Sequence, residues 1–195
     1  MTTEKVTDET FLCDEDLGTT EAESGHQKMT LYRRRDAIGL RESHAMDEVV
    51  MPDAAALFMG KFDTSALGDG AFTEMVFQHS GPEGYSIVRA WFAPGYLLPR
   101  HSHDADCTYY VTSGELRLGS QVLGAGEGFF VPKDRPYSYE AGPEGVEVLE
   151  FRHATTFNIR FVDEQEERWQ RVFDVANRSR QAWREMRAER IRSAV

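Results

Sequence analysis

The middle of the chain alternates short apolar runs with turn residues, and this pattern predicts β-strands. Apolar or alternating segments at residues 72–79, 85–93 and 146–152 are separated by glycine, proline, serine and acidic residues. Residues 114–124 predict a hairpin that turns at Gly119 and Ser120, and residues 125–132 and 157–161 add two further apolar runs. Many short strands with turn signals at short intervals are typical of an antiparallel barrel or sandwich.

After residue 163 the spacing of apolar residues changes to that of a helix. Apolar side chains recur at intervals mostly of three, four and seven residues, at Trp169, Val172, Phe173, Ala176, Trp183, Met186 and Ile191. This spacing places them on one helix face. We therefore expect a C-terminal amphipathic helix over residues 163–192 that packs its tryptophans against the barrel or a second subunit.

The residues before the barrel fall into two parts. Residues 1–28 carry eight acidic side chains and few large apolar ones, so we expect an acidic, disordered tail. Residues 29–62 are expected to form an N-terminal extension with short strands at 49–51 and 54–62. Such strands would cover a sheet edge or pair with a second subunit, and we expect a homodimer. The barrel itself is expected over residues 63–162.

Composition narrows the function classes. The chain has 195 residues, 41% of them hydrophobic, and a net charge of −11, which indicates one globular domain without the basic surface of a nucleic-acid-binding protein. No apolar run is long enough for a membrane span, and the N-terminus lacks the basic-then-apolar pattern of a signal peptide. We expect a cytoplasmic protein with no nucleic-acid or membrane partner. Cys13 and Cys107 form no framework of disulfide spacings.

A pair of histidines is the first candidate for chemistry. His101 and His103 are separated by one residue on a segment expected to be extended, so their side chains share one face. Two imidazoles so placed can chelate a single metal ion. Asp104 and Asp106, which follow, are expected to be turn residues, or else oxygen ligands or hydrogen-bond partners of the imidazoles.

The residues around this pair form a longer motif. Gly95 is followed by five residues, His101-x-His103, three residues, Cys107, six residues and Gly114. This pattern resembles the first motif of the cupin superfamily, with Cys107 at the position where those proteins usually carry glutamate.

A second motif lies downstream. Gly126 is followed by five residues and then by Pro132-x-Asp134-x-x-Tyr137, three residues and Ala141. It is similar to the second cupin motif, in which the last three named positions are usually glycine, histidine and asparagine. Together the motifs imply an all-β fold, a cupin double-stranded β-helix (jelly-roll) barrel with an N-terminal extension and the C-terminal α-helix.

The resemblance also implies a metal site. Metal-binding cupins usually hold Fe, Mn, Ni or Zn with three histidines and a glutamate, of which His101 and His103 match here. Cys107 is a candidate third ligand, and His153 a further one, with His79 the other histidine near the barrel. Cysteine dioxygenase, another cupin, carries cysteine at the same position and joins it to a tyrosine, which draws attention to Cys107 and Tyr137. These two are ligands, a redox or acid pair, or replacements in a site that no longer binds metal.

The strand at residues 85–93 suggests how a substrate is held. Tyr85, Arg89 and Trp91 share one face. If this face lines the cavity, Arg89 is a candidate anchor for a carboxylate, and Arg89 or Tyr137 would orient or protonate the substrate. The expected cavity lining is aromatic and consists of Tyr85, Trp91, Tyr109, Phe130 and Tyr139.

These observations lead to one main hypothesis and two alternatives. The main hypothesis is a metal-dependent cupin enzyme, an Fe(II) oxygenase acting on a small aromatic or carbonyl-bearing substrate. The cofactor would be one divalent transition metal, Fe(II) by preference, with Zn, Mn or Ni as alternatives. The other readings are a non-catalytic small-molecule-binding cupin with a degenerate site and no cofactor, or a Zn-dependent lyase or isomerase.

Overall fold

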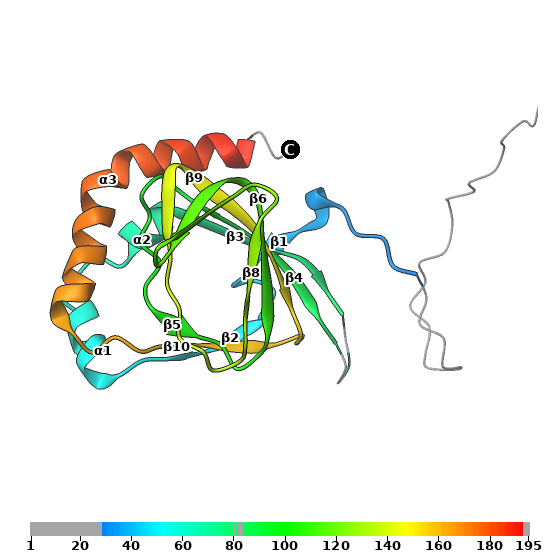
Figure 1. The fold of residues 1–195 in the computed structure, drawn as a ribbon, viewed down its shortest axis with the longest axis horizontal. Helices are drawn as coiled ribbons and strands as arrows, with labels where there is room; N and C mark the ends of the chain where they lie inside the picture. Colours follow the sequence, from blue (N-terminus) through cyan, green and yellow to red (C-terminus); the bar gives the residue numbers. More distant parts are fainter. Residues whose placement is uncertain (1–28, 80, 82–83, 193–195) are drawn as a thin grey trace, which may run out of the picture. The chain divides into compact units, whose positions relative to one another are not determined.

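The strands are arranged in two sheets that surround a common core (Figure 1). The structure is a computed structural model and describes residues 29–79, 81 and 84–192; the expected acidic tail lies outside the described residues. The larger, seven-stranded sheet has the order β1 (Ile38–Gly39), β3 (Ala71–Gln78), β4 (Ser86–Phe92), β9 (Glu140–Arg152), β6 (Cys107–Leu118) and β7 (Gln121–Gly124), with β8 (Gly128–Val131) paired to β6. The three-stranded sheet has the order β2 (Met46–Val50), β10 (Phe157–Phe161) and β5 (His101–Ser102). This mostly β architecture with a C-terminal helix confirms the predicted fold class.

Residue pairs opposite each other on neighbouring strands define the inner face of the larger sheet. Tyr109 of β6 lies opposite Glu150 of β9, and Cys107 lies opposite Arg152. Cys107, Tyr109 and Arg152 are buried. Because side chains alternate along a strand, the residues between them point to the other face, where Tyr110 is 45% exposed.

The prediction of two strands before the barrel is only partly correct. Residues 54–62 were expected to be extended, but α1 occupies Asp53–Met59 and α2 follows at Ser65–Asp69, while a short 3-10 helix lies at Arg34–Asp36. The alanine-rich sequence that follows Pro52 has high helix propensity, and Asp53 places an acidic side chain in the first turn. Ala55 and Phe58, three residues apart, supply the buried face. The helical spacing of these two buried side chains therefore describes the segment better than its run of apolar residues, which predicted a strand.

β2 was expected to cover an edge or to pair with a second subunit. It pairs in parallel with β10 of the same chain, so it covers an edge. β1 likewise pairs with β3 at the end of the larger sheet. The homodimer stays a prediction.

The predicted C-terminal helix is confirmed, and α3 runs over Glu166–Arg192. Its buried residues include Trp169, Phe173 and Trp183, and the Phe173 ring stacks on Phe62 with centroids 4.6 Å apart. The indole Nε1 of Trp183 donates to the backbone carbonyl of Pro94 at 3.0 Å, which ties the helix to the chain just before the histidine pair. Figure 1 shows α3 running alongside the sheets, with α1 and α2 next to it. None of the described helices has the length and apolar composition that crossing a membrane requires.

Candidate functional site

His101 begins β5 and His103 directly follows that strand, and a tyrosine from the second motif, Tyr137, lies directly across from His101. The His101 N–H donates to the Tyr137 carbonyl at 3.0 Å, and the Tyr137 N–H donates to the His101 carbonyl at 2.9 Å. Residues that exchange both hydrogen bonds are opposite each other, so their side chains share a face. The ring centroids of His101 and Tyr137 are 4.6 Å apart, and those of His101 and His103 are 4.9 Å apart.

Backbone carbonyls determine the tautomer of both imidazoles. His101 Nδ1 lies 2.7 Å from the Pro99 carbonyl oxygen, and His103 Nδ1 lies 2.5 Å from that of Asn158. A carbonyl oxygen only accepts, so each Nδ1 carries the proton. In the neutral imidazole, Nε2 then has a free lone pair, which is the arrangement that metal-binding histidines use.

A directed chain of hydrogen bonds starts from His101. Its Nε2 lone pair accepts from the Tyr137 hydroxyl at 3.0 Å, so the Tyr137 oxygen is left to accept from the Tyr109 hydroxyl at 2.5 Å. Arg152 Nη2 donates in turn to the Tyr109 oxygen at 3.5 Å. Since a guanidinium only donates, every proton in this chain points toward His101.

A buried ion pair at the far end of this chain was missed by the sequence analysis. Arg152 is 1% exposed, and its Nη2 lies 2.7 Å from Glu150 Oε2. The guanidinium also covers the Phe157 ring at 3.9 Å, while its Nε and Nη1 have no hydrogen-bond partner among the described residues. The alternation of Val146, Val148, Glu150 and Arg152 along β9 was a signal, because two β-branched residues in phase with the charged pair indicate the inner face.

Burial controls the charge of the titratable groups. It lowers the pKa of His101 to about 4 and that of His103 to about 2, and the nearby Arg152 cation acts in the same direction. Burial raises the pKa of the Cys107 thiol to about 12 and the pKa of the Tyr137 hydroxyl well above its usual range. Near neutral pH both imidazoles, the thiol and the phenol are therefore neutral.

The donors present fit a metal held by two imidazoles with a phenol beside them. His101 Nε2 and the Tyr137 hydroxyl are 3.0 Å apart, close to the separation of about 3 Å between neighbouring donors around an ion at about 2.1 Å. They do not fit a closed cage: among the described residues, no three His, Cys, Asp or Glu side chains are grouped so as to hold a metal ion. A site with few protein ligands leaves positions open for substrate.

The other expected ligands are not grouped with the histidine pair. Cys107 points toward the inner face of β6 opposite Arg152 and is neutral. His153 is exposed beyond the end of β9, and His79 stacks on Tyr85 with ring centroids 5.7 Å apart. Asp104 accepts the backbone N–H of Asn158 on β10, and Asp106 accepts that of Lys133 after β8, so both carboxylates tie this segment to distant parts of the chain instead of to the imidazoles.

Arg89 does not face the barrel interior. Its guanidinium forms ion pairs with Glu74 and Glu147, and Glu147 also accepts from Arg190 of α3, so Arg89 lies on the sheet face that α3 covers. The arginine that lies in the interior is Arg152, and not the expected Arg89. Both faces of β4 are buried, so the pattern of apolar residues along it could not tell the inside from the outside.

Only some of the expected aromatic residues line the barrel interior. Tyr109 and Tyr139 are buried near Tyr137, with Tyr137 and Tyr139 ring centroids 6.4 Å apart. Tyr85 is 45% exposed and Phe130 is 59% exposed, so neither lines the interior. Trp91 is buried, but Arg190 of α3 covers its ring, so it too points outward. An aromatic residue that the sequence analysis did not include, Phe129, stacks on Tyr109 with centroids 4.6 Å apart.

Comparison with known structures gives several neighbours that align with less than half of this chain. An oxalate decarboxylase variant from Bacillus subtilis aligns over 48% of this chain and 28% of its own, with 19% identity and a TM-score of 0.43. KdgF from a Halomonas species aligns over 44% of this chain and 80% of its own, with 21% identity and a TM-score of 0.38. An RmlC-like cupin from Shewanella frigidimarina aligns over 45% of this chain and 79% of its own, with 28% identity and a TM-score of 0.39.

One of these neighbours is named a cupin, the superfamily that the two motifs resemble. No family model matches the chain, and no curated protein matches its sequence. The aligned part is less than half of this chain, and it spans less than a third of the oxalate decarboxylase chain, a protein with Mn(II) centres. TM-scores of 0.38 to 0.43 are too low to transfer a function to this chain.

Proposed function

We propose that the barrel is the site of a metal-dependent enzyme in which His101 and His103 hold one divalent transition metal. The observation that carries the proposal is the matched pair of imidazoles. Each donates Nδ1–H to a backbone carbonyl, and both rings lie near the same tyrosine, Tyr137, with ring centroids 4.6 Å away for His101 and 6.4 Å away for His103. Such carbonyl contacts orient metal-binding histidines.

Tyr137 is the acid of this site. In the metal-free barrel its proton lies against His101 Nε2. If His101 held a metal through that lone pair, the Tyr137 hydroxyl would have no acceptor there and would donate to an oxygen of a bound substrate. Tyr109, held by Arg152, donates to the Tyr137 oxygen and stabilises the negative charge that develops when the proton leaves.

The surroundings favour a small substrate with a carbonyl or carboxylate group. The walls near the histidines are aromatic, from Phe129, Tyr139 and Phe157, and Arg152 adds a buried cation with two unused N–H donors. We propose Fe(II) as the metal, since imidazole ligands suit it. When bound, it would supply Lewis-acid and O2-activating chemistry to an oxygenase. Zn would support a lyase or isomerase instead.

Elemental analysis of protein purified without a histidine tag tests the metal. We expect close to one equivalent of a transition metal per chain, or uptake of one equivalent of Fe(II) by the metal-free protein. His101→Ala with His103→Ala should abolish this binding, whereas the matched control His153→Ala should keep it. The proposal fails if the wild type takes up no metal, or if the double variant retains it.

Activity separates the metal enzymes from one another. With metal present, consumption of O2 on addition of small 2-oxo acids or phenols supports the oxygenase, and product formation without O2 consumption supports the lyase or isomerase. Tyr137→Phe should keep the metal but lower turnover by about 100-fold, the usual size of a general-acid contribution. A Tyr137→Phe variant with full turnover would remove the tyrosine from the proposal.

A second function is favoured by the absence of further donors. The cluster offers two imidazoles, the Tyr137 phenol already satisfies His101, and Cys107 at the usual glutamate position is a neutral thiol. This set of described residues also suits a non-catalytic cupin that binds a small molecule in the barrel. Failure of the metal-free protein to take up metal, together with binding of a small aromatic acid seen by calorimetry, would support it.

A further inference from the structure

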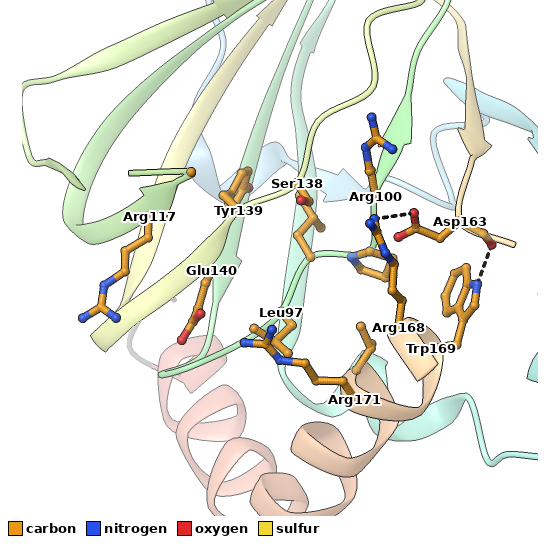
Figure 2. A pocket seen from close by; sticks show the side chains of 14 residues that line it. Leu97, Arg100, Arg117, Ser138, Tyr139, Glu140, Asp163, Arg168, Trp169 and Arg171 are labelled. Atoms are coloured by element: carbon orange, nitrogen blue, oxygen red, sulfur yellow. Dashed lines mark hydrogen bonds and ion pairs between the residues drawn. The ribbon is translucent and has the colours of Figure 1, made fainter. Parts of the chain in front are cut away.

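A groove outside the barrel lies between the first half of α3 and the chain that leads into β5. Its volume is about 480 Å³, and it is lined by the segment 97–100, by residues near the β6–β7 turn, by the segment 138–140 and by the start of α3. Figure 2 shows Arg171 reaching from α3 past Leu97, with Arg117 and Glu140 farther along the same side. The histidines do not line it, although Pro99, whose carbonyl accepts from His101, does.

The charged side chains of this groove are mainly arginines. They come from three separate parts of the chain: Arg100 precedes β5, Arg117 is on β6, and Arg168 and Arg171 are on α3. Arg168 is paired with Asp163 at 2.9 Å. The side chains of Arg100, Arg117 and Arg171 are exposed and form no hydrogen bond or ion pair with another described residue.

Arg117 and Arg171 line this groove with unpaired guanidinium groups, whereas the guanidinium of Arg100 points away from α3 (Figure 2). Glu140 lies opposite Arg117 on the neighbouring strand. Arginine is well suited to phosphate, because its planar group donates two parallel hydrogen bonds to two oxygens. The arrangement therefore matches an anion with more than one phosphate group.

We propose that this groove binds a small molecule carrying a diphosphate group. Its volume lies in the range of small-molecule sites, and the barrel and α3 enclose it on two sides. The acidic remainder of the chain disfavours a nucleic acid. Glu140 is the only acidic lining residue without a paired cation among the described residues, and its carboxylate opposes the anion.

Titration calorimetry with inorganic pyrophosphate at low salt tests the proposal on the full-length, metal-free chain. We expect binding to the wild type that weakens as salt is added. The Arg117→Gln, Arg171→Gln double variant should bind at least tenfold more weakly, since it loses two charge-assisted contacts. The control double variant Arg41→Gln, Arg160→Gln, which removes two exposed arginines outside the groove, should bind like the wild type.

Glu140 provides a test in the opposite direction. Glu140→Gln should tighten pyrophosphate binding several-fold, because it removes the opposing charge while keeping the shape of the side chain. The proposal is overturned if the wild type does not bind pyrophosphate, if both double variants bind equally, or if Glu140→Gln weakens binding. Equal binding of citrate would replace phosphate by carboxylate and also overturn it. None of these readouts depends on the metal site.

Discussion

Acid should destabilise this protein through His101, whose position inside the barrel lowers its pKa to about 4. In the unfolded chain the pKa returns to about 6.5. The unfolded state therefore takes up the proton first as the pH falls. Stability attributable to this residue is present above about pH 6.5 and is lost as the pH falls toward about 4.

The size of the effect follows from the shift. His101 is 3% exposed, so solvent screens the shift little. Between about pH 7.5 and about pH 4.5 the linkage amounts to roughly 2.5 kcal/mol for His101. The comparison with His101→Gln isolates it, because glutamine does not titrate and all other acidic and basic groups are shared.

Urea unfolding followed by tryptophan fluorescence, on metal-free protein at a series of pH values, measures the effect. The free energy of unfolding of the wild type should fall by roughly 2.5 kcal/mol more than that of His101→Gln over this range. The exposed control His153→Gln should follow the wild type. Parallel curves for the wild type and His101→Gln would refute the burial argument, and so would a steeper fall in the variant.

Two packing predictions concern the surroundings of α3 and β4. Gly70→Ala should lower the free energy of unfolding by roughly 1–3 kcal/mol, because a Cβ there would lie 2.3 Å from the Trp183 ring. The control Gly39→Ala should change it little, since a Cβ there meets nothing within 4 Å. Equal urea midpoints for the two variants would contradict this prediction. Arg89→Met should cost roughly 3 kcal/mol by leaving Glu74, whose side chain is 12% exposed, without its cation. Adding Glu74→Leu should recover much of the loss in the same assay, whereas an additive loss would contradict the pairing.

Local chemistry accounts for the parts of the fold that the sequence alone predicts. The motif glycines Gly95, Gly114 and Gly126 all have positive φ angles, Gly95 and Gly126 in turns and Gly114 at an irregularity within β6. Asp134, where the second motif usually has glycine, keeps a positive φ of 61°, which aspartate tolerates better than most residues. Asp134 therefore keeps the turn in the same conformation. The backbone of both motifs is retained although Cys107 and Tyr137 stand where cupins usually carry glutamate and histidine. Turns and helical spacing depend on residues that are close in sequence, so both can be predicted from the sequence alone.

The site itself required long-range register, which no local pattern encodes. His101 and Tyr137 meet because two segments 36 residues apart exchange backbone hydrogen bonds. Which arginine faces the interior depends on the covering of β4 by α3: with both faces buried, the pattern suggested Arg89, and only the packing shows that Arg152 is the one inside. The sequence by itself determined the frame of turns, the C-terminal helix and the histidine pair. The tertiary structure decided which side chains join that pair, because distant strands have to align before their inner faces exist.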